Sequence, residues 1–223
     1  MKNILAISGI GLIIIILVVS PFLIKVRVVC KSQYGDCPPG VTSELNTVTG
    51  KRLFFARNEL KKILKSNFLI SDFSLQFKLP DVVHADVILK KPIFALKNTS
   101  SNQTALVDKD GTVLEITDSS ALPTVEVNSP LPKVGQMVDS DTFFALKLEN
   151  GIFQMYQVNI GEMQNSTLLV ELPGQIRVIL PLEDADSNLL LGSLRLIYST
   201  IQSEGNKNLY KEIDMRYKNP VLR

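Results

Sequence analysis

The residues of this chain that could do chemistry are few and far apart. His84 is the only histidine, and it follows two valines with no serine or cysteine placed beside it as a nucleophile. A histidine on the surface or edge of a strand is therefore the simpler interpretation. Two cysteines and one histidine cannot complete a four-ligand zinc site. We expect neither a nucleophile–base pair nor a metal site.

Two acidic strings resemble parts of known sites. The string 108–111 has the Asp-x-Asp-Gly spacing of a calcium loop, but Leu106 and Thr117 stand at the first and twelfth positions, where carboxylates are needed. We interpret this string as a turn. The acidic residues of 183–186 could pair for acid–base catalysis, but they also fit a solvated loop that precedes a helix. We therefore expect that the chain is not an enzyme and binds no cofactor.

The two cysteines, Cys30 and Cys37, are close in sequence and are followed by a Pro-Pro-Gly turn. In an oxidising compartment they would form a disulfide that closes a small loop, which stabilises a fold by roughly 2–3 kcal/mol on the chain-entropy estimate. Two unrelated free thiols are the alternative. The spacing alone leaves both interpretations open.

The most apolar stretch of the chain is 4–24, which has 21 residues and no charge. A helix rises about 1.5 Å per residue, so this stretch would be about 31 Å long, close to the thickness of a bilayer core. We expect a retained membrane span, with a cleaved signal peptide as the alternative. The basic residues Lys25, Arg27 and Lys31 favour a cytoplasmic position for the rest of the chain, whereas the cysteine pair favours the outside.

The charge balance excludes some partners. The formal net charge is only +2, with 24 basic and 22 acidic residues. This near balance predicts no surface for nucleic acid and no polybasic contact with anionic lipid. Since the chain has no tryptophan, we expect valine, isoleucine and leucine to fill its core.

The elements expected in 25–97 form a small α+β domain. A helix starting near Asn58 places Leu60, Ile63 and Leu64 on one face. The stretch 72–79 then alternates strictly between polar and apolar residues, as in a half-buried strand. The predicted order is a strand (26–29), a helix (41–45), a second helix (58–68), and two further strands (72–79 and 82–89).

The rest of the chain is expected to be mainly sheet. The polar stretch 98–104 is interpreted as a linker, and an Asp-Gly turn at 110–111 predicts a hairpin. One helix is expected, at 187–201. The chain should end in an alternating strand at 209–217. The other predicted strands are 123–127, 155–160, 167–172 and 175–180.

Four sets of sequence strings, in this order, resemble the bacterial cell-division family FtsQ, also called DivIB. The string 106–113, LVDKDGTV, is similar to the family's LVD-x-x-G-x-V, and 212–217, EIDMRY, is similar to its closing IDLRY. Leu89 departs from the glutamate of many members, and the cysteine pair is not a general family feature, which suggests a divergent lineage. The remaining strings are 79–80, 90–95, 122–123, 131–132 with Gly135, and 219–223.

The resemblance implies a fold and a location. The fold would be α+β, with a cytoplasmic tail (1–3), a transmembrane helix (4–24), a POTRA-like βααββ domain (25–97), a linker (98–104) and a mostly antiparallel β-domain with one long helix (105–223). The protein would be single-pass in the cytoplasmic membrane, with its C-terminal domain outside and concentrated at the division septum.

The resemblance also implies a function. The chain would be a non-enzymatic divisome scaffold that binds FtsB/DivIC-like and FtsL-like coiled-coil proteins and bridges them to the septal FtsW/FtsI-type synthase pair. Two alternatives are a POTRA-bearing transport or assembly factor and a membrane-anchored extracytoplasmic enzyme. The sequence disfavours both, since it has no barrel-length series of strands and few catalytic residues.

The last predicted strand is the expected partner-binding site, because an exposed sheet edge can pair with a strand of another protein. Arg216 and Tyr217 would be the side-chain anchors, since arginine and tyrosine are enriched at interface hot spots. The alternative is that Ile213, Met215 and Tyr217 form the core face of the strand. The complete expected site is Ile213, Asp214, Met215, Arg216, Tyr217 and Lys218.

Overall fold

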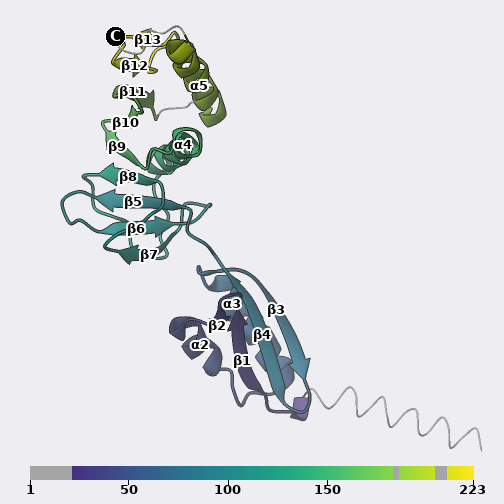
Figure 1. Ribbon diagram of the computed structural model, residues 1–223. Helices are drawn as coiled ribbons and strands as arrows, with labels where there is room; N and C mark the ends of the chain where they lie inside the picture. Colours follow the sequence, from purple (N-terminus) through teal and green to yellow (C-terminus); the bar gives the residue numbers. More distant parts are fainter. Residues whose placement is uncertain (1–21, 183–185, 204–209) are drawn as a thin grey trace, which may run out of the picture. The chain divides into compact units, whose positions relative to one another are not determined.

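The structure is a computed structural model that describes residues 22–182, 186–203 and 210–223 (Figure 1). It is an α+β protein whose chain divides into two compact units, Met1–Lys90 (unit 1) and Lys91–Arg223 (unit 2). Each unit has its own cluster of buried apolar residues. We therefore describe the two units separately.

Unit 1 has a mixed sheet with two helices. Within its described residues the sheet has four strands in the order β2-β1-β4-β3, where β1 and β4 are parallel and the other neighbours are antiparallel. The order strand, helix, helix, strand, strand is present, with the two-residue strand β2 added. The elements are β1 (Arg27–Ser32), β2 (Gly35–Asp36), α2 (Pro39–Asn46), α3 (Leu53–Ser66), β3 (Ile70–Lys78) and β4 (Val82–Leu89).

The core of unit 1 follows from two sequence periods. In α3 the buried residues Ala56, Leu60 and Leu64 recur every four positions and so form one stripe. In β4 every second residue from Val83 to Val87 is buried, as expected for a strand with one covered face. These two sets belong to one apolar cluster, so the helices cover one face of the sheet.

Unit 2 is built on a larger mixed sheet. Its described strands follow the order β13-β12-β11-β10-β9-β8-β5-β6-β7, with α4 and α5 packed on it through one apolar cluster. The elements are β5 (Phe94–Asn98), β6 (Thr104–Val107), β7 (Val113–Thr117), β8 (Thr124–Val127), α4 (Ser140–Tyr156), β9 (Ile160–Gln164), β10 (Thr167–Leu172), β11 (Ile176–Pro181), α5 (Ser187–Ser203), β12 (Glu212–Asp214) and β13 (Val221–Leu222).

The prediction of a mostly antiparallel β-domain with one long helix is wrong. The described part of unit 2 contains the parallel pairs β5–β8, β8–β9 and β11–β12, and two 17-residue helices. Neighbouring parallel strands need a crossover connection, which is usually a helix. Here α4 connects β8 to β9, and α5 connects β11 to β12. The stretch 155–160, predicted as a strand, instead contains the end of α4.

The predicted linker 98–104 is also corrected. Residues 99–103 form the turn between β5 and β6, which are antiparallel neighbours in one sheet. Asn98 holds this turn, since its side chain accepts from the backbone N of Ser101 (2.6 Å) and donates to the carbonyl of Ser129 (2.7 Å). The division between the units lies at Lys90–Lys91.

The predicted membrane span and single-pass location stand corrected. In the part of the chain that the structure describes, none of the helices has the length and apolar character needed to cross a membrane. Residues 1–21, which include the predicted cytoplasmic tail and most of the predicted span 4–24, lie outside the described residues.

Candidate functional site

The predicted partner-binding segment begins inside the sheet rather than at its edge. Strand β12 (Glu212–Asp214) pairs with β11 on one side and with β13 on the other. At this end of the sheet the edge strand among the described residues is therefore β13, whose Val221 and Leu222 are partly exposed. Between β12 and β13 the chain leaves the sheet in a bend, and this bend carries Tyr217 and Lys218.

Burial separates the six predicted residues into two groups. Ile213, Asp214 and Met215 are buried, and both Ile213 and Met215 belong to the core of unit 2. Arg216, Tyr217 and Lys218 are exposed, and 55% of the Tyr217 surface is accessible. The alternative interpretation, a core face, thus describes the first half of the segment, whereas the second half is available to a partner.

Asp214 is a fully buried carboxylate that organises this end of the sheet. It accepts hydrogen bonds from Arg216 Nε (2.9 Å) and Nη2 (2.6 Å), and Arg223 Nη2 lies 3.9 Å away. The bonds from the Arg216 guanidinium hold the pKa of the Asp214 carboxyl below its ordinary value. Arg216 is therefore committed to Asp214, and Tyr217 and Lys218 are better candidates for partner contacts.

The edge strand β13 is attached to β12 by the backbone of Arg223. Its carbonyl accepts from the backbone N of Lys211 (2.7 Å) and of Glu212 (3.0 Å), and its own N donates to the carbonyl of Glu212 (3.0 Å). The guanidinium of Arg223 also lies 3.1 Å from a carboxylate oxygen of Glu212. These contacts order a short edge beside the exposed bend that carries Tyr217.

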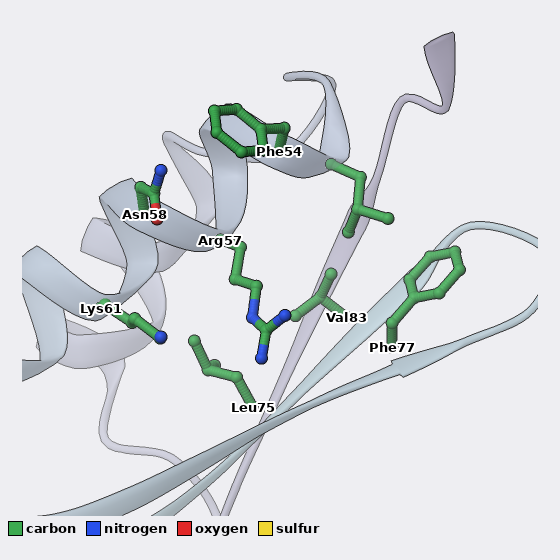
Figure 2. A pocket seen from close by; sticks show the side chains of 8 residues that line it. Phe54, Arg57, Asn58, Lys61, Leu75, Phe77 and Val83 are labelled. Carbon is green, nitrogen blue, oxygen red and sulfur yellow. The ribbon is translucent and has the colours of Figure 1, made fainter. Parts of the chain in front are cut away.

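A second surface, which the sequence did not predict, lies in unit 1 between α3 and β3 (Figure 2). It is a groove of about 480 Å³, and Figure 2 shows the side chain of Arg57 reaching from α3 into it above Leu75. Arg57 and Lys61 are its only charged lining residues among those described. The lining residues are Leu53, Phe54, Arg57, Asn58, Lys61, Leu75, Phe77 and Val83.

Glu149 is the most unusual ionisable residue that the sequence did not single out. It lies on the buried face of α4, and neither carboxylate oxygen has a hydrogen-bond partner among the described residues. A methyl group at Gly161 would lie 2.6 Å from its Oε2, so the glycine provides the space for this carboxyl group. Burial raises the pKa of Glu149 to about 8.

The other candidate residues lie apart from these surfaces. Cys30 and Cys37 form a disulfide. His84 is half-buried in β4. The side chain of Asp108 accepts hydrogen bonds from the backbone of Asp110 (2.9 Å) and Thr112 (2.8 Å), the contacts expected of a turn.

Groups of acidic, histidine or cysteine residues that could hold a metal ion are absent from the described residues. Of the acidic run 183–186, residues 183–185 lie outside the described residues. The described surface features are the β12–β13 end of the sheet in unit 2 and the groove in unit 1.

Sequence comparisons identify no relative that would assign a function. No family model and no curated protein matches this chain.

Proposed function

We propose that this chain is a non-enzymatic interaction scaffold of the FtsQ/DivIB type, which bridges cell-division proteins at mid-cell. One structural observation carries the proposal. The C-terminal segment whose sequence resembles that family forms the β12–β13 end of a large sheet, with Tyr217 and Lys218 exposed beside the edge. An accessible sheet edge next to an exposed aromatic residue has the features of a strand-capturing surface.

Capture would combine backbone and side-chain contacts. A strand of the partner would pair with the outer edge of β13 through main-chain hydrogen bonds, which give affinity with little sequence preference. Tyr217 would pack its ring on the partner and supply specificity. Its ring centroid lies 5.9 Å from Cζ of Arg216, which is itself held by Asp214, so the ring has a fixed neighbour.

The partners expected from the resemblance are FtsB/DivIC-like and FtsL-like coiled-coil proteins. An extended segment next to such a coiled coil could supply the added strand. The septal FtsW/FtsI-type synthase pair would then be reached through these proteins. In this proposal the chain contributes binding surfaces and no chemistry.

The proposal predicts that Tyr217→Asp weakens partner capture while the protein stays folded. The ring is 55% exposed, so its replacement leaves the core intact, but a charged side chain cannot replace the aromatic contact. If Tyr217 is a hot spot, binding should weaken roughly tenfold or more. The measurement is a quantitative pull-down of the FtsB/DivIC-like protein of the same organism.

Tyr34→Asp is the matched control, because Tyr34 is a 70% exposed tyrosine in unit 1. It should bind the partner as the unchanged protein does. Cells carrying only the Tyr217→Asp chain should form filaments, and cells carrying Tyr34→Asp should divide normally. Normal capture by a folded Tyr217→Asp protein would exclude this surface, and normal division after removal of the whole chain would exclude the division role.

A further inference from the structure

Strand β3 of unit 1 has an unpaired edge. In the described sheet order β2-β1-β4-β3, only β4 pairs with it. The strand spans nine residues, Ile70–Lys78, and its pairing with β4 shifts register between Ile70 and Asp72. Beyond this irregularity the pairing with β4 is regular from Asp72 to Lys78. A long, regular edge strand is a template for pairing with another strand.

The sequence of this regular segment, Asp-Phe-Ser-Leu-Gln-Phe-Lys, is nearly symmetric about Leu75. In antiparallel pairing of two copies centred on Leu75, position 72 would face position 78 of the other copy, and position 73 would face 77. An aspartate would then face a lysine at both ends, and a phenylalanine would face a phenylalanine. Opposite charges and aromatic pairs that face each other across strands are stabilising.

The two faces of β3 agree with this register. Phe73, Leu75 and Phe77 are opposite buried residues of β4 and therefore point to the covered face of the sheet. Asp72 and Lys78 point to the other face. In the symmetric pairing, apolar residues would meet apolar residues on one face, and charged residues would meet opposite charges on the other.

The groove beside β3 shows that its apolar side is incompletely covered. Leu75 and Phe77 line the groove between α3 and β3 (Figure 2). The exposed fraction of Phe77 is 38%. A second β3 would place its own Phe73 against Phe77 at this opening. Arg57 and Lys61 lie on α3 and can keep their charged ends in water, because both side chains are long.

We propose that the β3 edge is a self-association surface, at which two copies of this chain pair their β3 strands antiparallel about Leu75. Charge complementarity selects this occupant and this register. If the centre of the pairing moved to Ser74, Asp72 would face Gln76 and both ion pairs would be lost. The two four-stranded sheets would join into one continuous sheet across the two copies.

Charge reversal at the two ends of the segment tests the register. In a dimer of Asp72→Lys chains both end pairs become Lys–Lys, and in a dimer of Lys78→Asp chains both become Asp–Asp. Each variant alone should therefore dimerise roughly tenfold more weakly, or worse. An equimolar mixture of the two variants restores two opposite-charge pairs and should dimerise again, as should the double variant Asp72→Lys/Lys78→Asp.

The measurement is the sedimentation-velocity mass of the full chain, over a concentration series into the high micromolar range at low salt. Every variant keeps the same N-terminal residues, so differences between variants report on β3. Asp36→Lys, at the opposite edge of the sheet, and Lys62→Asp, an α3 residue outside the groove lining, are the charge-matched controls. Both should dimerise as the unchanged chain does.

Three results would overturn the proposal. The first is an unchanged chain that stays monomeric throughout the series, which would leave the edge to some other partner. The second is an equimolar mixture, or a double variant, that dimerises no more strongly than the single variants. The third is an equal loss of dimerisation in the two control variants, since this would show a general effect of charge and not an effect of β3 pairing.

Discussion

Among single residues, Glu149 has the environment that departs most from what its side chain prefers. A buried carboxylate without a hydrogen-bond partner is costly, and a protein reduces this cost by keeping the group protonated. No charged group contributes to the shift in its pKa, which desolvation alone raises to about 8. The carboxyl group of Glu149 should therefore be mostly neutral at pH 7 and should lose its proton only in mildly alkaline solution.

The stability of the folded chain should depend on pH through Glu149. Since the folded pKa of Glu149 is raised, the unfolded chain releases this proton first, from about pH 4.5, and stability falls as the pH rises towards 8. The variant Glu149→Gln lacks this contribution, because a glutamine side chain does not titrate in this pH range. The free energy of unfolding of the unchanged chain, relative to this variant, should fall by a few kcal/mol between pH 5 and 8, since one pKa unit is worth about 1.4 kcal/mol.

Urea unfolding followed by circular dichroism at several pH values measures this difference. Glu171→Gln is the control, because it makes the same substitution at an exposed glutamate in β10. A constant difference between the unchanged chain and Glu149→Gln at all pH values would show that Glu149 is not protonated in the folded state.

For single residues, the sequence pattern predicted some buried side chains correctly and others wrongly. Alternation places Ile213 and Met215 inside, as the structure does, but it also places Tyr217 with them. Tyr217 is exposed because β12 ends at Asp214 and the chain then bends before β13. Glu149 had no local signal, because a glutamate in a helix normally marks the solvent side, and only the tertiary fold buries this one.

Among elements, strands with a strict period of two were predictable, and long-range pairing was not. The alternation predicted at 72–79 corresponds to β3, and the strand predicted at 82–89 has the bounds of β4. The helix predicted at 58–68 corresponds to α3, which begins earlier, at Leu53, and ends at Ser66. Helix α4 was missed because two positions of its buried face carry the polar residues Thr142 and Glu149, which interrupt the apolar stripe. With α4 missing, no crossover was predicted, and the parallel pair β8–β9 could not be predicted either.

The packing of α4 on α5 makes a prediction about two helical glycines. A methyl group at Gly151 of α4 would clash with the Leu191 side chain of α5, whereas one at Gly192 of α5 would meet open space. Gly151→Ala should therefore lower the free energy of unfolding by about 1–3 kcal/mol. Gly192→Ala should raise it by roughly 0.5–1 kcal/mol, because alanine favours a helix over glycine.

The two variants control for each other, since both replace a helical glycine by alanine. Thermal and urea unfolding of each, beside the unchanged chain, gives the sign and size of the effect. If both variants are stabilised, the Leu191 side chain moves aside at little cost and the helices are not closely packed there. If both are destabilised, the helix preference of alanine does not decide the outcome at Gly192.

At the scale of the whole molecule, the sequence predicted two folded units but placed the boundary too late. The stretch 98–104 is polar and reads as a linker, yet it lies within a hairpin whose strands both belong to the sheet of unit 2. The actual division, at Lys90–Lys91, has no such polar run. A polar string is equally typical of a linker and a hairpin turn, and only the pairing of β5 with β8 and β6 separates them.

The two units have separate apolar clusters, with no described residue buried in both, so a change in one core should act mainly on its own unit. The Cys30–Cys37 disulfide belongs to unit 1 and provides the test. Cys30→Ser/Cys37→Ser removes a short closed loop and should destabilise that unit by roughly 2–3 kcal/mol. Hydrogen exchange read by peptide gives separate protection values for the two units.

Peptides from α3 and β4 should exchange faster in the double variant at equal pH, and peptides from β10 and β11 should exchange as in the unchanged chain. Glu149→Gln is the opposite control, because it should alter only peptides of unit 2. Equal acceleration in both units on loss of the disulfide would show that they unfold together. The Cys30–Cys37 disulfide of unit 1 would then also stabilise unit 2, including the β12–β13 surface proposed to capture a partner.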